Sequence, residues 1–103
     1  MNRRPIRRHA HKDPVTPEMR QAVLERDGRT CVKPKIEPNT PDSTCFGPLT
    51  LDHVRDFAML GKRAPSDMAH LVTICWNHHI IDGWATSHRP ELLAYLEAVN
   101  ERS

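Results

Sequence analysis

Three cysteines and one histidine are spaced so that they could hold a single metal ion. Cys75 and His78 are three residues apart, so one tight turn can direct both side chains to the same ion. Cys31 and Cys45 are the two remaining cysteines. Structural zinc ions are held in closed tetrahedra of Cys and His ligands, and we therefore predict a Cys3His zinc site. The alternative is three buried free thiols that pack as small apolar groups.

A second group of potential ligands remains when that site is filled: Asp52, His53, His70 and His79. Successive side chains on a helix diverge by about 100°, so His79 should point away from the ion that His78 binds. A carboxylate oxygen such as that of Asp52, with a histidine nitrogen added, suits a magnesium or manganese ion in a site that processes phosphates. We predict that Asp52 and His79 share such an ion. Taken singly, each histidine is equally typical of an ordinary hydrogen-bonded residue.

The size and composition of the chain favour one small, metal-assisted domain. A chain of 103 residues leaves no room for a second core, and only 38% of its residues are hydrophobic. Three cysteines cannot all pair as disulfides, and residues 1–12 lack the apolar stretch of a secretion signal. We therefore expect a cytoplasmic protein with reduced thiols. No segment is apolar enough for a membrane role.

Positive charge is concentrated at the start of the chain. The formal net charge is only +2, yet residues 1–12 hold five of the 15 basic residues. These are Arg3, Arg4, Arg7, Arg8 and Lys12. We predict a basic, disordered arm over residues 1–14 that suits a polyanion, with a plain solvated tail as the alternative. Residues 15–103 then form a single domain, with its core at about residues 20–86.

Helix signals flank the region that holds the candidate ligands. Thr16 can cap a helix that runs to about Asp27, and Gly28 suits a left-handed stop. The predicted apolar positions of this helix are Met19, Ala22, Val23 and the aliphatic stem of Arg26. A final helix begins near Ser87 or His88. Its apolar stripe comprises Leu92, Leu93, Tyr95, Leu96 and Val99.

Between these helices the pattern predicts a loop, two strands and one more helix. Residues 33–48 contain four prolines and predict an irregular loop. Residues 49–54 alternate well enough for a short strand, and residues 71–74 have the β-branched content of a second. A helix over about residues 76–84 should follow and carry the two adjacent histidines.

The ordered set of Asp52-His53, His70-Leu71-Val72 and Cys75-x-x-His78-His79 resembles the HNH endonucleases. The ββα-metal motif of that family is two short strands and a helix around one divalent ion. The resemblance spans about residues 20–81, and residues 23–31 are similar to the segment that leads into the first zinc ligand of small phage and bacterial members. It implies a small α+β fold in which the ββα-metal HNH motif and a structural zinc knuckle are flanked by N- and C-terminal helices.

The resemblance also implies a role for each matching residue. His53 would be the general base that takes a proton from the attacking water. Asp52 and His79 would ligate a catalytic divalent cation such as Mg²⁺, Mn²⁺ or Ni²⁺. His70 stands where the family usually has an Asn that holds the base histidine or the local turn. Asp82 stands where a lysine is often found, which removes one phosphate contact.

The function implied is that of a metal-dependent DNA endonuclease or nickase that hydrolyses phosphodiester bonds. Arg55, Lys62, Arg63 and the arm are candidate phosphate contacts, although the first three are equally typical of a solvated loop. One alternative is a noncatalytic, zinc-stabilised DNA-binding module. Another, supplied by the resemblance alone, is a bacteriophage nuclease that acts with terminase subunits during DNA packaging in the bacterial cytoplasm.

Overall fold

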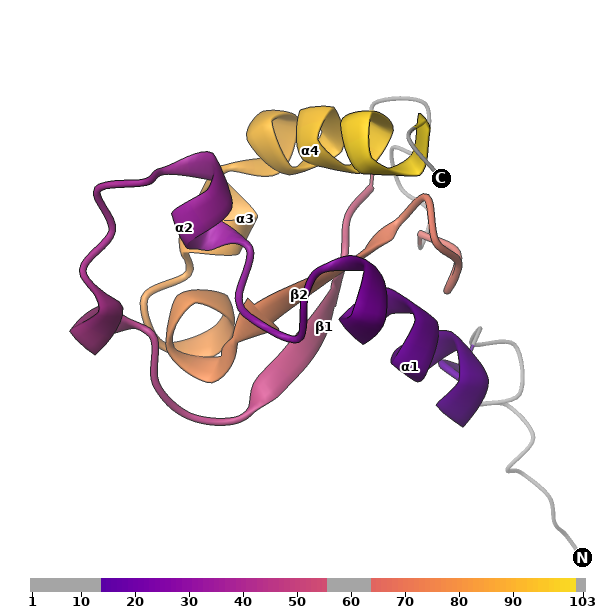
Figure 1. The fold of residues 1–103 in the computed structure, drawn as a ribbon, viewed down its shortest axis with the longest axis horizontal. Helices are drawn as coiled ribbons and strands as arrows, with labels where there is room; N and C mark the ends of the chain where they lie inside the picture. The colour runs from indigo at the N-terminus through magenta and orange to yellow at the C-terminus, as the bar shows by residue number, and fades with distance from the viewer. Residues whose placement is uncertain (1–13, 56–63, 102–103) are drawn as a thin grey trace, which may run out of the picture.

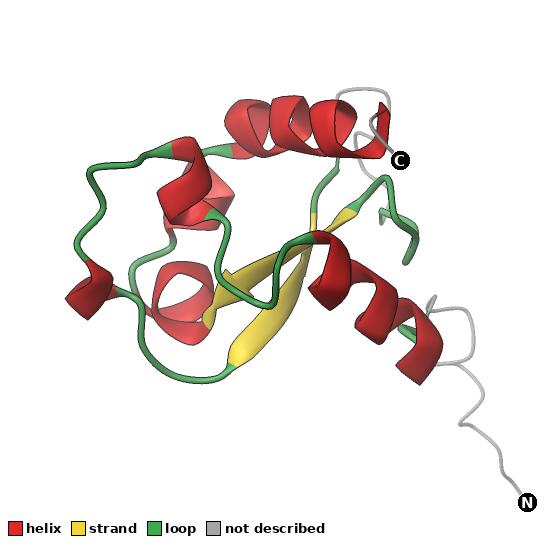
Figure 2. Cartoon of the chain, in the orientation of Figure 1, coloured by secondary structure: helices red, strands yellow, loops and turns green. Residues whose placement is uncertain are grey.

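The computed structural model describes residues 14–55 and 64–101. It is an α+β structure in which a two-stranded antiparallel sheet is surrounded by helices (Figures 1 and 2). The elements in chain order are α1 (Pro17–Arg26), α2 (Lys33–Ile36), η2 (Asp42–Thr44), β1 (Leu49–His53), β2 (Leu71–Cys75), η4 (Asn77–Ile81), α3 (Trp84–Ser87) and α4 (Arg89–Glu101). The predicted arm apart from Pro14, with its candidate phosphate contacts Arg3, Arg4, Arg7 and Arg8, lies outside the described residues, as do the candidates Lys62 and Arg63.

Helix α1 begins and ends where the sequence indicates. The Thr16 hydroxyl accepts a hydrogen bond of 3.0 Å from the Met19 amide, which satisfies one of the free amides at the helix start. After the last turn, Gly28 adopts a φ of +75°, which glycine tolerates without steric cost. The predicted apolar face needs one correction, because Ala22 is exposed whereas Leu24 is buried beside Val23.

The two predicted strands are confirmed and pair in antiparallel register from Leu49 opposite Cys75 to His53 opposite Leu71. Every residue of β2 is buried, whereas most of β1 is half-buried. Side chains alternate between the two faces of a strand. Thr50 and Asp52 therefore share one face of β1, and His53 belongs to the other.

The chain after β2 departs from the single helix expected over residues 76–84. A π-helical turn, η4, comes first and is closed by a 2.8 Å hydrogen bond from the Asp82 amide to the carbonyl of Asn77, five residues earlier. Gly83 then takes a left-handed φ of +70°, and the Asp82 carboxylate accepts from the Trp84 amide at 2.9 Å to start α3. The break thus falls at Asp82 and Gly83, because the left-handed glycine ends η4 and the aspartate carboxylate satisfies the first free amide of α3.

Helix α4 confirms the predicted final helix and completes the core. In Figure 1, α4 runs along the top of the view and α1 lies to the right, with the strands crossing the centre. Leu92 and Leu96 pack in one cluster with Val72, Ile74 and Trp84. Within the described ranges, every helix is too short or too polar to cross a membrane.

A buried carboxylate joins the two long helices to the sheet. Asp27 is 0% exposed and accepts hydrogen bonds from the Thr73 amide at 2.9 Å and from the Tyr95 hydroxyl at 2.7 Å. The guanidinium of Arg26 pairs with the same carboxylate at 2.9 Å. The sequence interpretation treated Arg26 as an aliphatic stem and missed this network.

Candidate metal centres

The predicted zinc ligands lie together in the fold. The ligand atoms of Cys31, Cys45, Cys75 and His78 all lie within 4.8 Å of one another. Nδ1 of His78 is 3.2 Å from the sulfur of Cys75, 3.6 Å from that of Cys45 and 3.9 Å from that of Cys31. Tetrahedral zinc, with bonds of about 2.3 Å to sulfur and 2.0–2.1 Å to nitrogen, would place S and N about 3.5 Å apart. The four side chains therefore fit one tetrahedral ion.

Separate parts of the chain contribute these four ligands. Cys31 follows the turn after α1, and the adjacent Val32 amide donates to Thr73 of β2 at 3.0 Å. Cys75 ends β2, and His78 lies in η4 one turn later. Cys45 comes directly after η2, within the proline-rich region expected to be irregular. The short helices α2 and η2 were missed because segments of three or four residues carry little periodicity.

Burial and crowding keep the thiols of the cluster protonated when no cation is bound. Burial raises the pKa of the Cys31 thiol. Burial, with the neighbouring thiols of Cys31 and Cys75 adding to it, raises the pKa of Cys45 to about 12. Burial also lowers the pKa of His78, so its ring is neutral as a ligand must be. A bound cation would offset the charge of the thiolates and so allow the thiols to ionise near neutral pH.

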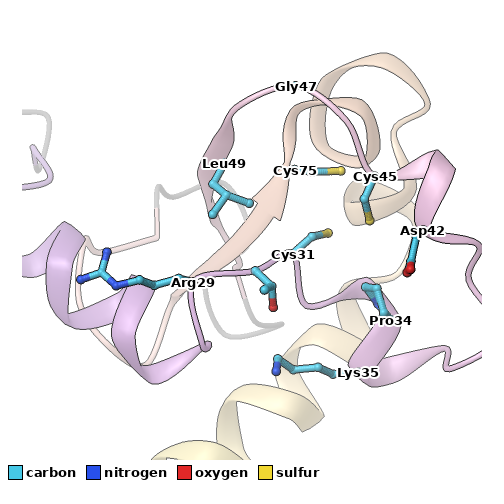
Figure 3. Close-up of a pocket in the computed structure, with 10 residues that line it drawn as sticks. Arg29, Cys31, Pro34, Lys35, Asp42, Cys45, Gly47, Leu49 and Cys75 are labelled. Atoms are coloured by element: carbon cyan, nitrogen blue, oxygen red, sulfur yellow. The ribbon is translucent and has the colours of Figure 1, made fainter.

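The cluster is accessible from one side. A cavity of about 580 Å³ lies against the three cysteines, whose side chains project toward a common region in Figure 3. Its other lining residues are Arg29, Thr30, Pro34, Lys35, Asp42, Gly47 and Leu49. An ion or a chelator can therefore approach the cluster through this opening.

Asp82 lies behind the histidine ligand. Its Oδ2 is 3.7 Å from Nε2 of His78, on the side of the ring opposite the sulfurs. A metal-bound histidine usually directs its second ring N–H at a carboxylate or carbonyl, which orients the ring and fixes its tautomer. The resemblance indicated only a lost phosphate contact at Asp82, and the i,i+4 spacing from His78 is the signal in the sequence that places its carboxylate near the ring.

Asp52 and His79 lie together at a second position. Oδ1 of Asp52 is 3.2 Å from Nε2 of His79. On the other side of the ring, Nδ1 is 2.6 Å from the Thr50 hydroxyl, which itself donates to the Ile74 carbonyl at 2.7 Å. Because that hydroxyl proton is already engaged, its oxygen accepts from Nδ1–H of His79. The neutral ring therefore presents the Nε2 lone pair toward the Asp52 carboxylate.

Two lone pairs that face each other suit a cation. Octahedral magnesium bonds of 2.0–2.1 Å would place adjacent ligand atoms about 3.0 Å apart, close to the 3.2 Å between Asp52 and His79. Such ions keep several waters and need only one or two protein ligands. With a protonated ring, the same two atoms would form an ion pair instead. As expected, His78 and His79 contact different groups.

The other two predicted site residues, His53 and His70, contact different partners. His53 is exposed at the end of β1, and its Nε2 is 2.8 Å from the Ser66 hydroxyl. Nδ1 of His70 is instead 2.7 Å from Oδ1 of Asp67 in the turn before β2. His70 thus organises the local turn, and Ser66 is the polar partner that sequence reasoning missed. Arg55, the one described phosphate candidate of its loop, is half-buried.

Comparisons with protein-family models, with curated proteins and with solved structures found no match to this chain. The fold and the geometry define a small α+β protein with a Cys3His cluster able to hold a metal ion.

Proposed function

We propose that this protein is a metal-dependent DNA endonuclease or nickase of HNH type, stabilised by one structural zinc ion. The observation that carries the proposal is the Asp52–His79 pair, with Nε2 of His79 directed at the carboxylate and His53 one residue further along β1. These residues also follow one another along the chain in the order that resembles the HNH endonucleases.

The Cys3His cluster supports zinc as the structural ion. Thiolates and imidazoles are the ligands that zinc prefers, and all four positions of its tetrahedron would be filled. The ligands join the turn after α1, the residue after η2, the end of β2 and η4. Metal binding would therefore hold together parts of a small core that its modest hydrophobic content stabilises weakly.

Asp52 and His79 would hold the catalytic cation, with Mg²⁺, Mn²⁺ and Ni²⁺ as candidates. When bound, such an ion supplies positive charge to the phosphate group as negative charge develops in the transition state. The protein prepares this position without the ion, because Thr50 fixes the ring of His79 and directs Nε2 toward Asp52.

His53 would act as the general base. A neutral imidazole can take a proton from an attacking water near neutral pH. Its exposure at the end of β1 lets water and a phosphodiester approach the ring. Arg55 and the basic residues of the arm would hold the DNA backbone through salt-sensitive contacts that carry no sequence information.

Plasmid cleavage over a panel of Mg²⁺, Mn²⁺ and Ni²⁺ tests this function. The wild-type protein, loaded with one equivalent of zinc, should nick or linearise the plasmid. His53→Ala and Asp52→Asn should each abolish cleavage while zinc content and far-UV circular dichroism stay as in the wild type. Ser87→Ala, a substitution in α3 outside the site, is the control and should cleave normally. Cleavage by His53→Ala would overturn the assigned base.

A noncatalytic, zinc-stabilised DNA-binding module is the second candidate. It is favoured by His70, whose ring pairs with Asp67 at 2.7 Å where the HNH family uses an Asn. A wild-type protein that binds DNA with one zinc ion, yet leaves it intact with every cation of the panel, would establish this function instead.

A further inference from the structure

A serine hydroxyl contacts the ring of the proposed base. Nε2 of His53 lies 2.8 Å from Oγ of Ser66, a hydrogen-bonding distance. Ser66 approaches from the turn that precedes β2, and this turn is joined to the end of β1 by a 2.7 Å bond from the Val54 amide to the His70 carbonyl. The end of one strand and the entry to its partner therefore hold the two side chains together.

The turn that carries Ser66 is internally hydrogen-bonded. The Asp67 carbonyl accepts from the amides of His70 at 3.1 Å and Leu71 at 3.0 Å. The Asp67 carboxylate accepts from the Ala69 amide at 3.1 Å and contacts the His70 ring at 2.7 Å. Ser66 is thus anchored by the residue that directly follows it.

Two helices hold the same turn from outside. Arg26 of α1 donates to the carbonyls of Met68 and Leu71, each at 2.6 Å. Asn100 of α4 donates to the Met68 carbonyl at 2.9 Å. The Arg26 side chain is 8% exposed, so these bonds are shielded from water. Such support limits how far Ser66 can move relative to β1, which is what a positioning group requires.

We propose that Ser66 is a positioning residue for His53. Its oxygen accepts the Nε2–H of the ring, which leaves the lone pair of Nδ1 free to take a proton from water. Because the hydroxyl is uncharged, it orients the ring without adding a negative charge beside the phosphate. This role rests on the proposed function, in which His53 is the base, but the hydrogen bond itself can be measured without any cleavage.

Nuclear magnetic resonance of the zinc-loaded, full-length protein tests the hydrogen bond. Long-range ¹H–¹⁵N spectra at alkaline pH report the tautomer of each neutral imidazole, and the signals missing from His53→Gln identify His53. The wild-type ring should carry its proton on Nε2. Ser66→Ala should shift the Nε2 resonance of His53. It should also move the tautomer ratio and the mobility of the His53 ring toward those of a free imidazole. Ser66→Thr, which keeps the hydroxyl, should resemble the wild type, as should the control Ser87→Ala.

Cleavage kinetics test the consequence for catalysis. Ser66→Ala should lower kcat by about two- to twelvefold, the fold-change expected for one neutral hydrogen bond, while KM for DNA stays unchanged. Ser66→Thr should restore kcat. Zinc content measured for each variant corrects the rates for the folded fraction, so that a purely structural role would leave the corrected kcat unchanged.

The outcomes are separable. A Ser66→Ala protein with the wild-type His53 spectrum, or with the wild-type kcat, overturns the positioning role, as does a wild-type ring protonated on Nδ1. If the wild-type protein fails to cleave DNA with every cation of the panel, the nuclease proposal fails, and this result leaves the positioning role of Ser66 undecided by kinetics. The spectra still decide whether Ser66 orients His53 in that case.

Discussion

Thr50→Val is the sharpest perturbation of the Asp52–His79 pair. Valine replaces the hydroxyl by a methyl group of similar size and suits a strand. It removes the 2.6 Å contact to Nδ1 of His79 and the 2.7 Å bond to the Ile74 carbonyl. Both proposed ligands stay in place, so the variant tests only whether the hydroxyl orients the ring.

The expected loss follows from the contacts of that hydroxyl. One neutral hydrogen bond contributes about 0.5–1.5 kcal/mol, or about two- to twelvefold in an equilibrium constant. Removal of a group that orients a metal-bound histidine lowers affinity by about 10- to 100-fold. The two ranges meet at about tenfold, and we expect Thr50→Val to weaken Mn²⁺ binding by this factor. The free energy of unfolding should fall by about 1–3 kcal/mol, because two bonds are lost.

Isothermal titration of the zinc-loaded protein with Mn²⁺ measures this effect. Asp52→Asn should abolish the binding and so identify the site. Thr40→Val is the matched control, because the Thr40 hydroxyl bonds to the Glu37 carbonyl at 2.7 Å and to the Lys33 amine at 2.9 Å, and neither bond involves Asp52 or His79. If Thr50→Val bound Mn²⁺ as tightly as the wild type while Asp52→Asn did not, the Thr50 hydroxyl would not orient the ring of His79.

Four further outcomes are expected. Chelation of the structural ion should lower the midpoint of thermal unfolding well below that of the zinc-loaded form, as seen by circular dichroism. In the metal-free protein the pKa of Cys45 is raised from 9.0 to about 12, so between these pH values the folded state retains a proton that the unfolded state loses. The free energy of unfolding, measured by urea titration, should therefore fall as the pH rises from 9.0 to about 12. The same fall in the zinc-loaded protein would contradict the assignment of Cys45 as a ligand. Asp82→Asn should weaken zinc binding about 10-fold, because it removes the carboxylate near Nε2 of His78. A competition assay with a chromophoric chelator measures this affinity, and an unchanged value would show that Asp82 does not orient His78. Asp27→Asn should lower the free energy of unfolding by about 3–5 kcal/mol in urea, because Arg26 would remain buried without its partner, and a loss under 1 kcal/mol would show that the charge pair matters little.

Local signals in the sequence predicted much of the fold. Thr16 caps α1 through a bond to a residue three positions later, and Gly28 ends the helix with its own backbone conformation. Alternating and β-branched residues likewise located both strands within one residue of their observed ends. These features depend on neighbours in the chain, which is why their residue types suffice to predict them.

The candidate metal ligands were predicted for a different reason. Cys31, Cys45, Cys75 and His78 are few and chemically distinctive, so their grouping required only that one ion use all the thiols. The spacing of His78 and His79 then assigned them to different surroundings, and the structure places one beside three sulfurs and the other beside Asp52.

The side chains that contact these candidate ligands from distant parts of the chain lie beyond such local rules. Thr50 reaches His79 across 29 positions of the chain, and Arg26 reaches the Leu71 carbonyl across 45. Threonine and arginine are common residues, and nothing in their immediate neighbours marks them for these contacts; only the register of the hairpin and the packing of α1 bring them into range. The sequence therefore predicted which candidate ligand groups lie together, and it did not predict the groups that contact them from distant parts of the chain. Tests at Thr50 and Ser66 examine that second class, whereas tests at Asp52 and His53 examine the first.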